Sequence, residues 1–222
     1  MGIMTIEHAD RLYWLGRYTE RVYTTIKFFS SSFDRVINHD ETACAEFCRQ
    51  LDIPNIYQGW DDFLKRYNFD RGNPDSVACN LDRVYDNAVV MRDEIGSDAI
   101  CYIQLAVYAL NRAAESETPY LEMQKVSDNM LAFWGITDDQ IESENVRNII
   151  KIGKRIERID LYARLGMPRE ALKREIRRLS GRIDRTNLHY SAEKVARLLE
   201  LVEQEAIPYR EIVNCVDSIV GS

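Results

Sequence analysis

A seven-residue pattern occurs twice in the sequence and constrains the fold more than any other feature. Residues 15–21 read LGRYTER and residues 152–158 read IGKRIER, so each copy has an apolar residue, a glycine and a basic residue, then two variable residues, then Glu-Arg. Each copy lies in a long stretch of helical periodicity without proline. A glycine inside a helix costs about 1 kcal/mol relative to alanine, a cost that is tolerated where another backbone or a ligand approaches closely. The repeat therefore predicts two helices that meet around a common polar centre.

The charged residues of the two copies are the candidate binding site. Two interpretations remain open. The cationic side chains could hold an anion, a nucleotide or an acidic peptide, with the glutamates orienting them. Alternatively, the same residues could form a buried Arg–Glu network that fixes how the helices pack. The six residues are Arg17, Glu20, Arg21, Lys154, Glu157 and Arg158.

Ten glycines and five prolines are few for 222 residues, and no segment shows sustained alternation of apolar and polar residues. Both observations favour long helices over strands. We expect an all-α, multi-helix bundle with essentially no β-sheet, in which two related halves pack as one domain over residues 1–222. The expected helices are 6–36 and 144–165, which carry the repeat, together with 42–51, 60–67, 74–95, 97–114, 119–134, 168–186, 192–204 and 208–219.

Capping residues set several of these boundaries. Asp40 and Thr42 are candidate caps for the short helix that ends at Leu51. Asn73 followed by Pro74 predicts the start of the helix 74–95, because asparagine caps helices and proline fits their first turn. Residues 137–144 are acidic and predict a loop that leads into the second repeat helix.

The net charge of −7 argues against a general nucleic-acid binder, whose domains are usually basic. The sequence has no secretory signal pattern, and no apolar run approaches the roughly 18–20 residues that span a bilayer. We therefore expect a cytoplasmic protein without a membrane or nucleic-acid partner. Cys44 and Cys48, with His39 nearby, are the one metal-like group, and without a second pair of ligands they predict no metal site. No cofactor motif is present.

The helix predicted over residues 168–186 carries seven basic and three acidic side chains, on a chain that is acidic as a whole. A solvated helix face is the simplest interpretation. A docking surface for an acidic partner is the alternative, with Arg174, Arg177 and Arg178 at its centre.

Several landmarks resemble one bacterial family, the alpha-E domain proteins. They span roughly residues 10–165, and the C-terminal quarter resembles the family more loosely. Lys154 replaces the arginine expected in the second phrase, and the chain resembles a short, stand-alone member. The landmarks are residues 12–18 with Glu20-Arg21, Asn73-Pro74 with Ser76, Asn87-Ala88 with Arg92, residues 133–135, and Gly153 with Glu157-Arg158.

The resemblance implies an all-helical domain without an assigned activity. It also implies an association with circularly permuted ATP-grasp ligases and transglutaminase-like proteins, that is, with a system for forming and cleaving amide bonds. We therefore expect a helical accessory protein without catalytic activity of its own, and a homo-oligomer is left open. The alternative is an enzyme that binds an anion, nucleotide or acidic peptide where the two Gly-basic-x-x-Glu-Arg helices cross.

Overall fold

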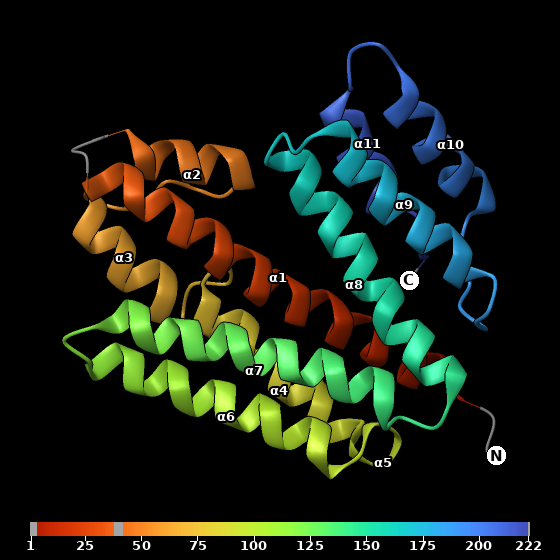
Figure 1. The fold of residues 1–222 in the computed structure, drawn as a ribbon, viewed down its shortest axis with the longest axis horizontal. Coiled ribbons are helices and arrows are strands. Elements are labelled where there is room, and N and C mark those ends of the chain that lie inside the picture. The colour runs from red at the N-terminus through yellow and green to blue at the C-terminus, as the bar shows by residue number, and fades with distance from the viewer. Residues whose placement is uncertain (1–3, 38–41, 222) are drawn as a thin grey trace. The chain divides into compact units, whose positions relative to one another are not determined.

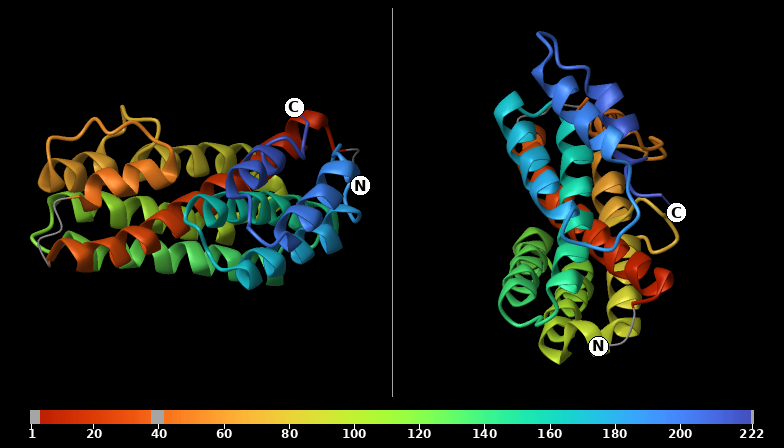
Figure 2. Two further views of the ribbon diagram at one scale, coloured as in Figure 1. Left: turned by 90° about the horizontal axis from the view of Figure 1, so that it is seen from above. Right: turned by 90° about the vertical axis from the view of Figure 1, so that its right-hand side faces the viewer.

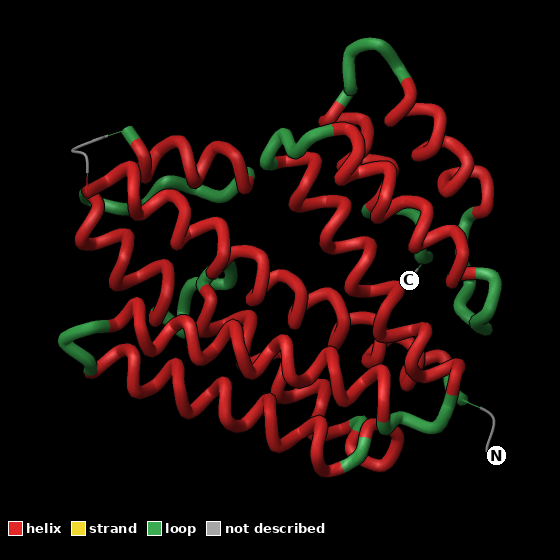
Figure 3. Tube along the Cα trace, in the orientation of Figure 1, coloured by secondary structure: helices red, strands yellow, loops and turns green. Residues whose placement is uncertain are grey.

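The described residues, 4–37 and 42–221 of the computed structural model, form eleven helices and no named strand, so the all-α prediction is confirmed. Figure 3 colours these residues as helix or loop throughout. One isolated bridge pairs Tyr190 with Val220. None of the described helices is both long and apolar enough to cross a membrane. The helices, labelled in Figure 1, are α1 (Ile6–Ile37), α2 (Ala43–Leu51), α3 (Trp60–Phe69), α4 (Val77–Val90), α5 (Arg92–Ile95), α6 (Ser97–Glu115), α7 (Pro119–Asp139), α8 (Glu144–Arg164), α9 (Arg169–Ile183), α10 (Ala192–Glu203) and α11 (Tyr209–Val216).

The contacts divide the chain into two compact units. The first unit consists of Met1–Arg17 and Glu142–Ser222, and the second is Tyr18–Ile141. Helix α1 contributes its first three turns to the first unit and the remainder to the second. The single-domain organisation stays a prediction, and each unit is described by itself.

The first unit is built around α8, which packs against α9 and α11, while α10 packs against α9 and α11. Helix α8 ends at Arg164, Gly166 adopts a φ of +61° in the turn that follows, and α9 begins at Arg169. An apolar stripe of α9 is buried, and its four members are at most 1% exposed: Leu172, Ile176, Leu179 and Ile183.

The second unit has an aromatic core. The ring of Phe63 lies 5.1 Å from the rings of both Phe47 and Tyr67 and 5.9 Å from that of Phe29. All four side chains are almost completely buried, which removes a large apolar area from water. Helices α6 and α7 lie side by side in this unit, as Figures 1 and 2 show.

The predicted start of the fourth helix is wrong by three residues. Ser76, not Asn73, caps α4, because its Oγ accepts a hydrogen bond from the Cys79 amide at 3.0 Å. Asn73 instead accepts from the amide of Asp75 and forms a turn before the helix. The helix predicted to reach residue 95 is also interrupted at Met91, whose φ of −94° and ψ of 15° separate α4 from α5.

The loop predicted from residue 137 begins later, because α7 continues to Asp139. Gly135 lies within α7 without ending it, and the Thr137 hydroxyl donates to the carbonyl of Phe133 at 2.8 Å. Ser143 caps the next helix, α8, because its Oγ accepts a hydrogen bond from the amide of Val146. The candidate cap Asp40 and the nearby His39 lie outside the described residues.

Candidate functional site

The two repeat glycines lie at a close contact between α1 and α8 within the first unit. A Cβ atom on Gly16 would lie 1.9 Å from the carbonyl oxygen of Ile150, and one on Gly153 would lie 2.1 Å from that of Tyr13. Each carbonyl belongs to the residue three positions before the other helix's glycine, so the contact is reciprocal. Both distances are far below van der Waals contact, and only glycine therefore fits at either position.

Next to this contact, Arg17 of α1 joins three elements of the first unit. Its Nε donates to Glu157 Oε2 of α8 at 2.7 Å, and its Nη2 donates to Asp217 Oδ1, directly after α11, at 3.1 Å. The guanidinium also lies 5.1 Å from the centre of the Trp14 ring. The side chain of Arg17 is 7% exposed and that of Glu157 is fully buried, so this is a buried ion pair with satisfied geometry.

The network around Arg17 holds more carboxylates than cations. Asp160 lies one turn after Glu157 and is also buried, and Arg164 Nε donates to both of its oxygens at 3.0 Å. Burial, reinforced by the charge of Glu157, raises the pKa of Asp160 to about 6 even though Arg164 opposes the shift. Burial works against the charge of Arg17, but Glu157 and the neighbouring groups outweigh it and raise its pKa. Three carboxylates thus share two arginines: Glu157, Asp160 and Asp217 against Arg17 and Arg164.

The remaining repeat residues lie in different surroundings. Glu20 and Arg21 belong to the second unit, where Glu20 is fully buried and accepts from Thr24 Oγ1 at 2.9 Å. Lys154 is 9% exposed. Arg158 lies 4.0 Å from Glu175 of α9. Within the first unit, the structure therefore brings Arg17 and Glu157 together and places Arg158 in a second network.

Glu175 is the centre of that second network, in which four arginines surround one carboxylate. It is 1% exposed, and the bound nitrogen of Arg155 lies 2.5 Å from its Oε2. The nitrogens of Arg178 and Arg174 lie 3.0 and 3.4 Å from Oε1. Burial opposes the charge of Glu175, but Arg155 and Arg158 outweigh it and lower its pKa.

Sequence reasoning missed two members of these networks. Asp217 lies 200 residues after Arg17 and follows a short helix, so no local pattern connects the two. Glu175 counted as one of three acids on an exposed helix. However, it lies next to Ile176 and three residues after Leu172, which places it beside the apolar stripe. That spacing was the available signal.

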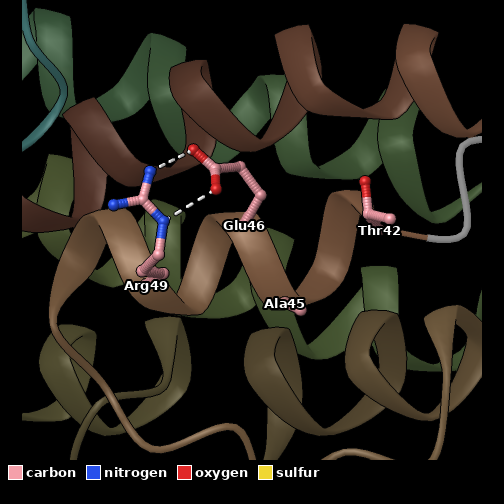
Figure 4. Close-up of a pocket in the computed structure, with 4 residues that line it drawn as sticks. All are labelled: Thr42, Ala45, Glu46 and Arg49. Carbon is pink, nitrogen blue, oxygen red and sulfur yellow. Dashed lines mark hydrogen bonds and ion pairs between the residues drawn. The ribbon is translucent and has the colours of Figure 1, made fainter.

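The two pockets described lie elsewhere, in the second unit. One depression, of about 330 Å³, is lined by Thr42, Ala45, Glu46 and Arg49 (Figure 4). Its charges are paired with each other, because Arg49 donates to both oxygens of Glu46 at 2.8 and 2.6 Å. The other depression lies between α6 and α7 and contains a similar local pair, Glu122 with Lys125.

Burial raises the pKa of three cysteine thiols, those of Cys44, Cys48 and Cys215. Cys44 and Cys48 are buried, and burial raises the pKa of Cys48 to about 12, so its thiol stays protonated near neutral pH. In the described part of the chain, no three histidine, cysteine, aspartate or glutamate side chains are placed to hold a metal ion.

Comparison with known proteins identifies the family. No protein of curated function and no solved structure matches the chain. Residues 4–173 match the alpha-E family, described as a predicted alpha-helical domain with a conserved ER motif. The matched range includes both Glu-Arg dipeptides, Glu20-Arg21 and Glu157-Arg158, and the described residues are helical throughout this range apart from the connecting loops. The chain therefore belongs to the alpha-E family.

Proposed function

We propose that this protein is a helical accessory protein that acts by binding partner proteins. The proposed partners are a circularly permuted ATP-grasp amide or peptide ligase and a transglutaminase-like protein, which the family resemblance implies. The observation that carries the proposal is the state of the second Glu-Arg phrase. Glu157 is fully buried and bonded to Arg17 at 2.7 Å, so its carboxylate is committed to packing α1 against α8. A buried carboxylate that is already paired in this way stabilises the packing of the helices and is poorly placed to bind a substrate from solution.

The candidate partner surface lies on α9. The side chains of Arg174 and Arg178 are 55% and 50% exposed, and Arg177 is exposed as well. Arginine is enriched at protein interfaces because its planar fork of donors recognises carboxylates in a fixed geometry. This surface supports a binding role for the first unit.

The alternative, a ligand site at the crossing of the two Gly-basic-x-x-Glu-Arg helices, stays a prediction. The geometry within the first unit favours it less, because the backbones at Gly16 and Gly153 leave no room for even a methyl group. If the alternative held, Arg21→Ala would abolish ligand binding while leaving thermal stability nearly unchanged.

Co-purification tests the accessory role directly. The tagged protein is recovered from its own cell, and the proteins that accompany it are identified by mass spectrometry. The expected companion is an ATP-grasp protein in stoichiometric amount. The two purified proteins should then elute together in size-exclusion chromatography. If the purified ATP-grasp protein and this chain elute separately at micromolar concentrations, the proposal is wrong.

A matched pair of triple variants tests the proposed surface. Arg174→Ala/Arg177→Ala/Arg178→Ala should weaken the complex by about tenfold or more, because interface arginines often dominate binding energy. The control removes three exposed arginines elsewhere, Arg92, Arg112 and Arg210, and should leave the affinity within about twofold. A large fall in melting temperature of the first variant would show that its arginines are structural instead.

A further inference from the structure

Helices α8 and α9 face each other with a row of arginines that the fold alone does not explain. Arg174, Arg178 and Arg182 follow one another on α9 at intervals of four residues, so they lie along one side of the helix, and Arg185 follows in the turn directly after it. Arg155 of α8 reaches the same side through Glu175. We call this group the cationic seam: Arg155, Arg174, Arg178, Arg182 and Arg185.

One carboxylate, Glu175, pairs with three of these cations: Arg155, Arg174 and Arg178. Arg182 turns to Asn148 of α8, a neutral partner, at 2.9 Å. Asp184, the acid next to Arg185, accepts a hydrogen bond from the Tyr190 hydroxyl. On the opposite flank of α9, Glu203 of α10 pairs with Lys173 at 2.7 Å. The seam is thus in excess of positive charge, on a chain whose net charge is −7.

The seam also has more hydrogen-bond donors than acceptors. Each guanidinium offers five N–H groups, whereas a carboxylate accepts about four hydrogen bonds. Arg155 Nε is buried and has no hydrogen-bond partner among the described residues, although another nitrogen of that side chain binds Glu175. Arg174 and Arg178 each donate to Glu175 through one nitrogen and are about half exposed. The half-exposed guanidinium groups of Arg174 and Arg178 can therefore donate further hydrogen bonds to an acceptor that approaches from solvent.

Burial and, after it, the crowding of like charges disfavour the charged forms of two seam arginines, Arg155 and Arg182. Burial first, and the neighbouring arginines second, lower the pKa of Arg182, and burial together with Arg158 and Arg178 lowers that of Arg155 against the pull of Glu175. Like charges one turn apart on a helix destabilise it. A bound polyanion would relieve this repulsion and satisfy the remaining donors.

We propose that the cationic seam binds an acidic segment of a partner protein, with aspartate or glutamate carboxylates paired to successive seam arginines. This rests on the proposed accessory function and names the chemistry of the contact. Arginines four residues apart on α9 are spaced by about 6 Å along its axis. Carboxylates four apart on a helix have the same spacing, and those two apart on a strand are about 6.7 Å apart. Arginine clusters recognise acidic motifs in this way.

An acidic protein segment fits the seam better than a nucleic acid does. Single-stranded nucleic acids are bound by cations interleaved with aromatic side chains on which the bases stack. The stretch of α9 that carries the seam contains no aromatic residue, because it is built from Arg, Lys, Glu, Leu, Ile, Ser and Gly, with one Ala near its start. The negative charge of the whole chain also opposes a polyphosphate more than it opposes a short acidic segment.

Fluorescence anisotropy tests the seam with a defined probe. The probe is a labelled helical peptide of about 20 residues with glutamate at every fourth position, and its control carries glutamine instead. At about 50 mM salt the full-length protein should bind the glutamate peptide at least tenfold more tightly than the control, and about 500 mM salt should abolish the difference. Equal affinity for the two peptides would overturn the proposal.

Two matched double variants localise the binding. Arg174→Gln/Arg178→Gln should lose at least tenfold in affinity. Arg92→Gln/Arg210→Gln removes the same charge at two exposed positions outside α9, so it should lose less than about twofold. Arg185→Gln leaves the arginines around Glu175 in place and should lose about threefold, which keeps the test valid if the first variant does not fold. Equal losses in both double variants would overturn a specific seam.

Three further outcomes separate the alternatives. Tighter binding of a thymidine 20-mer than of the glutamate peptide would replace the acidic segment with a nucleic acid. Salt-sensitive self-association that Arg174→Gln/Arg178→Gln abolishes would replace it with a second copy of the chain. An ATP-grasp complex that forms equally well with every variant would overturn the seam and leave the proposed function intact. Peptide binding that depends on the seam, without an ATP-grasp complex, would support the seam and overturn the proposed function.

Discussion

Helix α8 carries two charge networks on different sides, and they are unbalanced in opposite directions. Towards α1 and α11, three carboxylates share Arg17 and Arg164, and the pKa of Asp160 is raised to about 6. Towards α9, several arginines share Glu175, and the pKa of Arg155 is lowered. The first network lies beside the close contact between the backbones of α1 and α8. The second reaches the surface through Arg174 and Arg178.

This difference separates architecture from interaction. In the Arg17 network each charge is paired inside the chain, and the reciprocal glycine contact holds the pairing helices together. In the cationic seam the chain supplies more donors than it can satisfy, at a surface that a partner can reach. We therefore expect substitutions in the first network to change stability and substitutions in the second to change binding.

The largest effect is expected at the glycine contact. Gly153→Ala would place a methyl group 2.1 Å from the carbonyl oxygen of Tyr13, and neither backbone can move without separating α1 from α8. The loss should exceed the 1–3 kcal/mol of ordinary overpacking and reach about 4 kcal/mol or more. Chemical denaturation followed by circular dichroism measures it.

Gly181 provides the matched control, because it lies within α9 and nothing lies within 4 Å of the position that a Cβ atom would take there. Gly181→Ala should stabilise the protein by about 0.5–1 kcal/mol through helix propensity alone. If Gly153→Ala were tolerated as well as Gly181→Ala, the contact between α1 and α8 would be looser than the reciprocal geometry requires, and the comparison between the two networks would lose its basis.

A second comparison removes one arginine from each network. Arg17→Met leaves Glu157 buried without its cation, which costs about 3 kcal/mol or more in buried pairs. Arg155→Met removes one of several cations around Glu175, leaves Arg174 and Arg178 in place and relieves repulsion, so it should cost about 1 kcal/mol or less. Urea denaturation of both variants gives the two values.

The double variant Arg17→Met/Glu157→Gln shows whether the first loss comes from the pair itself. Its destabilisation should be smaller than the sum of the single variants by about 2 kcal/mol, because residues in direct contact do not act additively. Additive losses, or a larger loss at Arg155 than at Arg17, would contradict the division of α8 into a structural and an interacting side.

Much of the fold follows from local sequence patterns. The periodicity predicts the repeat helices over 6–36 and 144–165, and the structure has them at Ile6–Ile37 and Glu144–Arg164. The errors in the predicted helix boundaries occur where two nearby residues could each begin or end a helix. Asn73 and Ser76 are both good caps, and the choice depends on the turn that Asn73 makes with Asp75. Glycine within a helix also misleads, because Gly135 stays helical where Gly166 adopts a φ of +61°.

The candidate site was less accessible to sequence reasoning. The repeat predicts that its two copies meet, and the structure places Arg17 on Glu157 and Gly16 on the backbone of Ile150. The pairing of Asp217 with Arg17 could not be predicted from the sequence, because it depends on how the last helices pack and not on any pattern near Arg17. The arginines of the cationic seam on α9 can be recognised from the sequence. The role of Glu175 cannot, because it depends on a contact with Arg155 of a different helix, α8.

The smallest expected effects are changes in the pH dependence of stability, with opposite signs in the two networks. Asp160 has a pKa of about 6 in the folded protein, above its ordinary value of 3.8, so the folded state binds more protons than the unfolded state between about pH 4 and 6. Stability therefore falls as the pH rises through that window.

Lys151, one turn before Arg155, has a pKa lowered to about 8 by burial first and by Arg182 and Arg155 second. Its charged form is disfavoured in the folded state, so stability rises between about pH 8 and the ordinary lysine pKa of 10.5.

Asp160→Asn and Lys151→Met remove these contributions one at a time. The difference in free energy of unfolding between Asp160→Asn and the unsubstituted protein should increase by about 1 kcal/mol from about pH 4 to pH 6.5. The corresponding difference for Lys151→Met should decrease by about 1 kcal/mol from about pH 8 to pH 10.5. Denaturation curves across both windows measure the differences, in which the other titrating groups cancel. A flat difference for both variants would mean that neither network is unbalanced. A flat difference for Lys151→Met alone would mean that the α9 side of the helix already has its counter-charges within the chain, and the reason to expect an acidic partner there would disappear.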